Sequence, residues 1–419
     1  MDEEKLRAYL ALLLRVENLG ALFGSGASVS AGGKEMSEII TGLKSDSEES
    51  HKFLSSKGWL CSDAGGVNVE ELIGKVKTAI HFYENIDRND AEKVKCEKVK
   101  CEKALTSLER CVLRAAKLED DFWTGKPENS SNGNSLEDYQ TFLIRLCSTR
   151  QPGQPLPWIF TLNYDLGVEW AAEILGININ NGFKGTHYRE FDPSTFDIGY
   201  RNFLSTGQAQ YDVHGVNYVK MHGSLSWRLD DDDTLREISS ESQISAINRF
   251  LEKRSDKFPS FLVLPSIEKF YQTAGYVYGE MIRRFHEFVR KNQTALIISG
   301  YSFNDSHINR VLESAMGNPT MQMVVFYTGF NGGRDSLSGV PLLKIVHEKL
   351  LPNVTIVGHD EEVHFGKVAK MLPVPAIVDR NMEELKKLRK LIEDATSSEK
   401  TQQPSLSDNT TEESENDDK

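Results

Sequence analysis

The chain has 419 residues, a formal net charge of −13, and an ordinary globular composition with 39% hydrophobic and 26% charged residues. These values argue against wholesale disorder and against a membrane-embedded chain. The acidic total also argues against broad nucleic-acid binding, which requires a positive surface. Five cysteines, odd in number and unevenly spread, fit a reducing compartment better than a disulfide framework.

The first segment, MDEEKLRAYLALLLRVENLG, has an acidic start and an apolar run too short for a signal peptide or a membrane span. Leu6, Leu10, Leu13 and Leu14 share one face of a helix, and Gly20 is a candidate to end that helix. We therefore expect a soluble, cytoplasmic protein whose first element is a helix.

Apolar runs rich in β-branched and aromatic residues predict buried strands. They lie at 21–23, 157–162, 217–221, 261–264, 294–299, 323–328 and 354–357. Helical patterns separate many of them, as in residues 276–292, where Val277, Met281, Phe285 and Phe288 recur at helical spacing. The alternation predicts a parallel α/β sheet with crossover helices.

Between residues 43 and 154 the strand pattern fades and charged helical sequence replaces it, which predicts a helical insertion. The pentad KVKCE occurs twice there and places Cys96 and Cys101 five residues apart. A helix turns by about 500° over five residues, so these thiols should diverge instead of sharing a metal. The predicted parts are a sheet domain at 1–42 and 155–375, the insertion at 43–154, a C-terminal helix at 376–393 and a disordered acidic tail at 394–419.

The first stretch with chemical meaning is LFGSGASVSAGG, which follows the first predicted strand. Gly24 and Gly26 allow a tight turn close to a ligand, and the amides beyond them could face a phosphate. The third glycine of the dinucleotide fingerprint GxGxxG would fall at Val29, so the usual dehydrogenase pattern is broken. A glycine and serine turn without any ligand is the alternative.

The second stretch, TLNYD, ends a predicted parallel strand, where side chains point into the ligand crevice of an α/β sheet. Asn163 could bond ribose hydroxyls or hold a water molecule. Asp165 could fix the turn or cap the following helix. The alternative for both residues is a capping role alone.

Two further strands end in the same way. In YVKMHGSLSW, His222 follows an apolar strand and precedes Gly223, and a histidine there can accept a proton near neutral pH. His214 precedes a glycine without such a strand, and His286 and His307 lie on predicted helices. In ALIISGYSFNDSHINRVL, a strand runs into Gly300, and Ser302 and Asn304 precede a helix that Asp305 can cap.

Together the four stretches resemble the sirtuin-like NAD-consuming domains, in particular the divergent branch found in bacterial antiphage defence. The first is similar to the family's GAGxSxxxG loop with Ser25 in place of alanine. TLNYDLGVE is similar to TxNYDxxxE, KMHGSLSW to KxHGSxxW, and GYSFNDSHIN to GYSxxDxxI. The four motifs occur in order between about residues 20 and 316.

The resemblance implies an α/β fold with a doubly wound, parallel, Rossmann-like sheet, here carrying a helical insertion. Protein-deacylating sirtuins have a zinc ribbon built on two cysteine pairs after the catalytic histidine. No cysteine follows Cys147 in this chain, so we expect no zinc ribbon and no metal site. The family's GIPDFR segment is also missing, since Gly32 is followed by GKEMSEII. Both losses favour hydrolysis of NAD over removal of acyl groups from a protein.

The resemblance also implies roles for single residues. Gly24, Gly26 and Ser28 would hold the diphosphate of NAD, and Gly300 and Ser302 would approach the adenosine half. The catalytic pair would be Asn163, which holds the nicotinamide ribose and the attacking water, and His222, which acts as the base. The remaining residues expected to bind NAD are Ser25, Ala27, Asp165, Gly223, Ser224, Tyr301 and Asn304, with Thr328 and Gly329 as candidates near adenine.

We therefore expect an NAD glycohydrolase that releases nicotinamide and ADP-ribose and depletes host NAD during abortive infection. No cofactor beyond NAD as substrate is expected. In its length the chain resembles effectors that are encoded beside a HerA-type hexameric ATPase. We therefore expect a homo-oligomer and such an ATPase as partners. We expect no binding to membranes and no direct binding to nucleic acid. The alternatives are a zinc-free NAD-dependent protein deacylase and a non-catalytic sensor of NAD or ADP-ribose.

Overall fold

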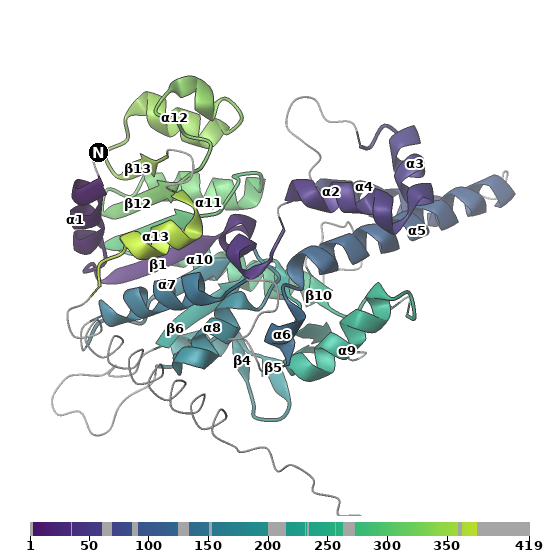
Figure 1. The fold of residues 1–419 in the computed structure, drawn as a ribbon, viewed down its shortest axis with the longest axis horizontal. Coiled ribbons are helices and arrows are strands. Elements are labelled where there is room, and N and C mark those ends of the chain that lie inside the picture. Colours follow the sequence, from purple (N-terminus) through teal and green to yellow (C-terminus); the bar gives the residue numbers. More distant parts are fainter. Residues whose placement is uncertain are drawn as a thin grey trace, which may run out of the picture. The chain divides into compact units, whose positions relative to one another are not determined.

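A computed structural model describes residues 3–34, 36–60, 69–85, 91–124, 134–150, 153–199, 215–230, 232, 234–255, 257–262, 273–358 and 363–374 (Figure 1). The chain up to Pro373 forms one compact unit, to which the following account applies. The predicted C-terminal helix at 376–393, the predicted tail at 394–419 and His214 lie outside the described residues.

A seven-stranded sheet lies at the centre of this unit, and all its neighbouring strands pair in parallel. In order across the sheet the strands are β13 (Val354–Val357), β12 (Met321–Phe326), β11 (Thr294–Ser299), β1 (Asn18–Phe23), β2 (Trp158–Thr161), β6 (Gly215–Lys220) and β3 (Asn178–Asn180). The chain proceeds from β1 toward β2 on one side and returns through β11 on the other. The strand order therefore reverses between β1 and β11, the place where such sheets bind ligands.

Both faces of the sheet carry helices, because successive strand residues point to opposite faces. Leu22, Phe160 and Val219 face one hydrophobic cluster, whose helices are α10 (Thr273–Arg290), α11 (Ser306–Met316) and α12 (Pro341–Lys349). Ala21 and Ile159 face the other, whose helices include α1 (Glu3–Leu13), α7 (Glu137–Ser148), α8 (Gly167–Leu175) and α13 (Phe365–Met371). In Figure 1, α7 and α13 cross the near face of the sheet and α10 lies behind it. The structure confirms the predicted α/β fold with a doubly wound, parallel sheet.

The predicted helix at 276–292 is confirmed as α10, and its four spaced apolar residues are buried against the sheet. The ring of Phe285 packs 4.8 Å from that of Phe160, measured between centroids, and Phe288 packs 5.3 Å from the same ring. Burial of each such side chain contributes about 1.5–3 kcal/mol. Helix α10 therefore fixes the sheet strand that leads to Asn163.

A group of helices contributes to the same unit between β1 and β2. These are α2 (Met36–Asp46), α3 (Glu48–Ser56), α4 (Val69–Asn85), α5 (Ala91–Ala116) and α6 (Asp120–Trp123), with α5 in contact with α2, α3 and α4 (Figure 1). The buried carboxylate of Asp46 on α2 pairs with Arg114 on α5 at 2.7 Å and with Arg110 at 3.4 Å. On α5, Cys96 is exposed and Cys101 is buried, which confirms that the two thiols diverge.

Two smaller sheets, one further α-helix and three 3₁₀ turns complete the described elements. One sheet contains β4 (Phe183–Lys184), β5 (Arg189–Phe191), β9 (Leu235–Glu237) and β8 (Trp227–Leu229), and the other pairs β7 (Gly223–Ser224) with β10 (Phe261–Leu262). The further α-helix is α9 (Ser240–Leu251), and the 3₁₀ turns are η1 (Ser25–Ala31), η3 (Pro193–Asp197) and η4 (Arg334–Leu337).

Two sequence predictions are wrong. The run at 261–264 was expected with the parallel sheet, yet β10 pairs antiparallel with β7, because an apolar run specifies burial and not a partner strand. Residues 263 and 264 lie outside the described part of the chain. The first helix ends at Leu13, and Gly20 lies inside β1, where an added Cβ would come within 2.6 Å of the Phe288 ring. Gly20 therefore serves sheet packing and not helix termination.

Candidate functional site

Two glycine turns meet at the carboxyl ends of β1 and β11. The amide of Gly24 donates to the Ser299 carbonyl at 3.2 Å, and the amide of Gly26 donates to the Gly300 carbonyl at 3.1 Å. Gly300 has φ of +67°, and a Cβ there would lie 2.4 Å from the backbone nitrogen of Ala27. Glycine is required because the two turns pack backbone to backbone. The contact holds η1 and the loop after β11 together at the reversal point of the sheet.

Asn163 joins the end of β2 to the first of these turns. Its side-chain nitrogen donates to the Gly24 carbonyl at 2.9 Å and to Ser28 Oγ at 2.8 Å, and its backbone amide donates to Thr161 Oγ1 at 3.0 Å. The side-chain nitrogen thus holds the turn and not the start of α8. The amide oxygen, at the other end of the same group, is the atom that Asn163 can present to a ligand.

Ser28 and Asp165 form the next contact in this chain of hydrogen bonds. Ser28 Oγ donates to Asp165 Oδ2 at 2.6 Å, and both side chains are buried. The other carboxylate oxygen of Asp165 accepts from the amide of Gly167 at 2.9 Å, the first residue of α8. Asp165 therefore fixes the start of that helix, the structural role that the sequence left open for it.

Lys220 and Glu169 support the loop that carries Asp165. Lys220, at the end of β6 and 2% exposed, donates to the backbone carbonyl of Asp165 and, at 2.9 Å, to Glu169 Oε1. Burial raises the pKa of Glu169, and the charge of Lys220 offsets part of that rise. Both residues belong to the quoted motifs, and here they serve the architecture of the loop.

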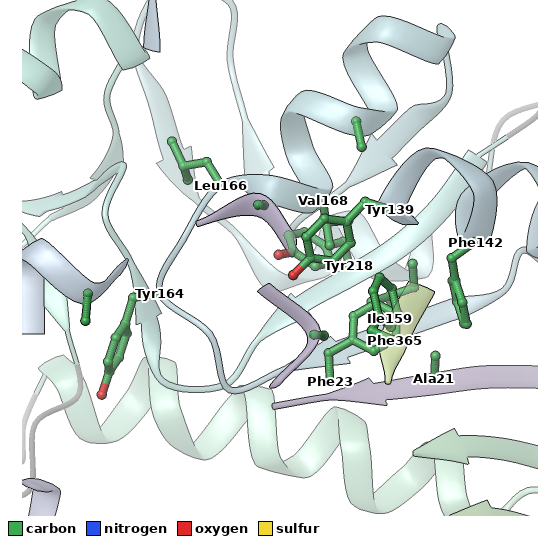
Figure 2. Close-up of a cluster of buried hydrophobic side chains, with 14 of the residues drawn as sticks. Ala21, Phe23, Tyr139, Phe142, Ile159, Tyr164, Leu166, Val168, Tyr218 and Phe365 are labelled. Atoms are coloured by element: carbon green, nitrogen blue, oxygen red, sulfur yellow. The ribbon is translucent and has the colours of Figure 1, made fainter. Parts of the chain in front are cut away.

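Buried aromatic rings lie next to η1, the turn that contains Ser28 (Figure 2). Phe365 from α13 packs 5.1 Å from Phe23 and 5.0 Å from Tyr139, measured between ring centroids. The hydroxyl of Tyr139 lies 2.9 Å from Ser28 Oγ. Burial and the nearby Asp165 raise the pKa of Tyr139 well above its ordinary value, so its phenol stays protonated. Figure 2 shows Tyr164 apart from this group.

His222 is held by the helix that follows the second turn. It lies in the turn after β6, it is 5% exposed, and its Nε2 lies 2.9 Å from Asp305 Oδ2. The rings of Tyr164 and Tyr278 have centroids 6.4 Å and 6.5 Å from that of His222. These neighbours orient the imidazole at the carboxyl end of the sheet.

Asp305 caps α11, as predicted, while it binds His222. Its Oδ1 accepts from the amides of His307 at 2.7 Å and Ile308 at 3.1 Å. Burial acts to raise the pKa of Asp305, but the hydrogen bonds from His222 and from both amides outweigh it, and the pKa is lowered. The residue is therefore a carboxylate at neutral pH and accepts the Nε2 proton of the imidazole.

A single cavity of about 810 Å³ connects these groups, within the roughly 300–1,000 Å³ common for small-molecule sites. Both candidate catalytic residues, Asn163 and His222, line it. The other predicted residues on its wall are Gly24, Ser25, Gly26, Ser28, Asp165, Gly300, Tyr301, Ser302, Asn304 and Thr328. The fold thus brings the four sequence stretches to one cavity.

Four predicted residues do not line this cavity. Ala27 is a fully buried residue of η1, and Gly223 and Ser224 belong to β7, where Ser224 Oγ lies 3.0 Å from Ser226 Oγ. Gly329 is likewise absent from the wall residues that the structure describes. Tyr301 lines the cavity, but its hydroxyl donates to Asn309 Oδ1 at 2.9 Å.

Sequence reasoning missed a large part of the wall. Its apolar side comes from α2, α4 and α5, through Ile39, Ile40, Val69, Ile73, Val112, Ala115 and Ala116. Tyr164, Tyr327, His364 and Phe365 also contribute. Among the described wall residues, Lys34 is the only lysine or arginine. Its position directly after the glycine stretch was the one available signal, whereas the helical residues carry no motif.

The described residues contain neither a metal-binding cluster nor a membrane-spanning helix. No group of three His, Cys, Asp or Glu side chains there could hold a metal ion. No helix there has the length and apolar character needed to cross a bilayer.

The comparisons with known proteins concern the part of the site that comes from residues 157–330. No curated protein matches the chain. Residues 157–330 match the family model described as a SIR2-like domain, and this range contains Asn163, His222 and Gly300 but not the turn at Gly24. The match supports a sirtuin-like family and a NAD-related function for the segment that carries most of the cavity's polar residues.

Proposed function

We propose that the protein hydrolyses NAD to nicotinamide and ADP-ribose in this cavity. The observation that carries the proposal is that Asn163 and His222 line one cavity, together with two interlocked glycine turns at the reversal point of a parallel sheet. The match of residues 157–330 to a SIR2-like domain supports NAD as the ligand.

Binding would use the two turns and one positive charge. The hydroxyl of Ser302 on the cavity wall offers a donor to the diphosphate or ribose, and Lys34 supplies attraction for the negative charge. The apolar residues from α2, α4 and α5 reduce the access of bulk water, which strengthens the electrostatic effects inside the cavity.

The reaction breaks the bond between C1′ of the nicotinamide ribose and the nicotinamide nitrogen. The bonding electron pair leaves with nicotinamide, which becomes neutral, and positive charge develops on the ribose. A water molecule held by the amide oxygen of Asn163 then bonds to C1′. Its proton passes to the other ring nitrogen of His222, since Nε2 already donates to Asp305, and the carboxylate of Asp305 stabilises the positive charge that forms on the ring. The balance is NAD⁺ and water to nicotinamide, ADP-ribose and one proton.

The resemblance to antiphage effectors extends the proposal to the cell. Depletion of NAD would stop phage growth by stopping the host, so the activity must be restrained until infection. A homo-oligomer or a HerA-type hexameric ATPase is the partner that we propose for this restraint.

The test is incubation of the full-length protein with NAD, alone and with the ATPase, followed by quantification of nicotinamide. We expect the unmutated protein to release nicotinamide, and we expect Asn163→Ala and His222→Ala each to abolish this release. Release that depends strictly on an acylated peptide would instead identify a deacylase. Tight NAD binding without turnover under either condition would identify a sensor, and both results would contradict the proposal.

A further inference from the structure

The hydroxyl of Ser28 has all its hydrogen-bonding capacity in use. A serine hydroxyl has one proton and two acceptor positions. The proton goes to the Asp165 carboxylate at 2.6 Å. Asn163 Nδ2 at 2.8 Å and the Tyr139 hydroxyl at 2.9 Å then fill the two acceptor positions. Tyr139 is therefore the donor in its contact with Ser28.

This arrangement decides which end of the Asn163 amide faces the turn. Gly24 offers a carbonyl and Ser28 offers a lone pair, so both partners accept, and only the amide nitrogen satisfies them. The amide oxygen is then directed to the opposite side. A Ser28 hydroxyl that turned its proton toward Asn163 would favour the reversed amide, and the donor from Tyr139 opposes that turn.

Tyr139 is well suited to hold Ser28 in place. It is 1% exposed, and the rings of Phe23 and Phe365 pack against it at 6.3 Å and 5.0 Å between centroids. It lies on α7, outside the range that matches the SIR2-like domain, and no motif of the sequence pointed to it.

We propose that Tyr139, acting through Ser28, is a positioning residue that keeps the Asn163 amide oxygen directed at the reacting water. The proposal rests on the proposed hydrolysis of NAD. It gives Ser28 a different role from the diphosphate contact that the resemblance implies, because its one proton is already committed to Asp165.

The experiment compares kcat and KM for nicotinamide release by Tyr139→Phe, Ser28→Ala and the double variant of the full chain. We expect kcat to fall about 5- to 10-fold in Tyr139→Phe and further in Ser28→Ala, with KM for NAD within about twofold. The double variant should be no slower than Ser28→Ala, because both changes interrupt one contact. Tyr218→Phe is the matched control, since Tyr218 is equally buried and Ser28 has no hydrogen-bonding position left for its hydroxyl. Its kcat should remain unchanged.

Three results would overturn the inference. A kcat of Tyr139→Phe equal to that of the wild type would refute the positioning role and leave the proposed hydrolysis of NAD standing. A raised KM with unchanged kcat in Ser28→Ala assigns Ser28 to substrate binding. An equal fall of kcat in Tyr218→Phe shows a general packing effect. Absence of nicotinamide release from the unmutated chain is a separate outcome, in which the proposed function fails and the positioning role fails with it.

Discussion

Asp305 binds His222 Nε2 with one carboxylate oxygen, at 2.9 Å, and caps α11 with the other. One residue therefore orients the proposed base and fixes the start of the helix that follows the second glycine turn. Asp305→Asn separates the two functions, because an asparagine oxygen still caps the helix. Its side-chain nitrogen would oppose the Nε2 proton of His222, so we predict a fall of kcat by about 10²-fold in assays of nicotinamide release.

The melting temperature of Asp305→Asn should stay within a few degrees of the wild type, since the cap remains. Asp305→Ala is the comparison that loses both functions, and it should also lose roughly 1 kcal/mol of stability. Unchanged kcat in Asp305→Asn would show that the contact with His222 has no part in the reaction.

Gly300→Ala should disrupt the contact between the two turns. Gly300 has positive φ, and its Cβ would meet the backbone of η1, which has no room to move aside. We predict a loss of about 2 kcal/mol or more in the free energy of unfolding, measured in urea, together with loss of NAD binding. Gly279→Ala, in open space on α10, is the control and should be neutral or stabilising. Equal stability of the two variants would refute the packing requirement.

Glu109 on α5 should make stability depend on pH. Burial raises its pKa from 4.5 to about 7, and the charges of Lys77 and Arg110 offset part of that rise. The folded state then keeps a proton that the unfolded chain releases near pH 4.5. This contribution to stability is complete below about pH 4.5 and is lost as pH rises through about 7.

At pH 8 the wild type must hold a charged Glu109 in a buried position, and Glu109→Gln removes that charge. We therefore predict a higher unfolding free energy for the variant than for the wild type at pH 8, by an amount on the order of 1–3 kcal/mol. Near pH 5 the two proteins should unfold at similar urea concentrations. A difference between them that does not change with pH would contradict the assignment.

Lys34 should affect affinity without affecting chemistry. Lys34→Glu places a negative charge on the cavity wall, and we predict a KM for NAD raised by about 10-fold or more with kcat nearly unchanged. Added salt should reduce the difference, because it screens the charge. Lys44→Glu makes the same charge change on α2 away from the wall residues. An equal rise of KM in Lys44→Glu would show that the effect of Lys34→Glu comes from the net charge of the protein and not from the position of Lys34 on the cavity wall.

The sequence predicted those parts of the site that have a local signature. Strand ends marked by Asn163, His222 and Gly300 were recognisable, because an apolar run that stops at a polar or glycine residue reports both the strand and its edge. Parallel strands share that edge, so the meeting of the three residues followed from the fold class.

The missed residues depend on contacts between distant segments. Nothing near Tyr139 in the sequence indicates that its hydroxyl reaches Ser28, and the apolar wall residues of α2, α4 and α5 look like ordinary helix-core positions. The glycines of the first turn were assigned to ligand approach, whereas their close neighbours in the structure belong to the Gly300 turn. Tertiary packing, which no local pattern encodes, decides each of these cases.

Hydrolysis in water enriched with ¹⁸O tests the central claim most directly. The account predicts that the full-length protein, supplied with NAD and no acylated peptide, forms nicotinamide and ADP-ribose in equal amounts. Each ADP-ribose should carry one ¹⁸O at C1′, and Asn163→Ala should form neither product. NAD that remains intact, or nicotinamide released only together with transfer of a peptide acyl group to ADP-ribose, would contradict the account.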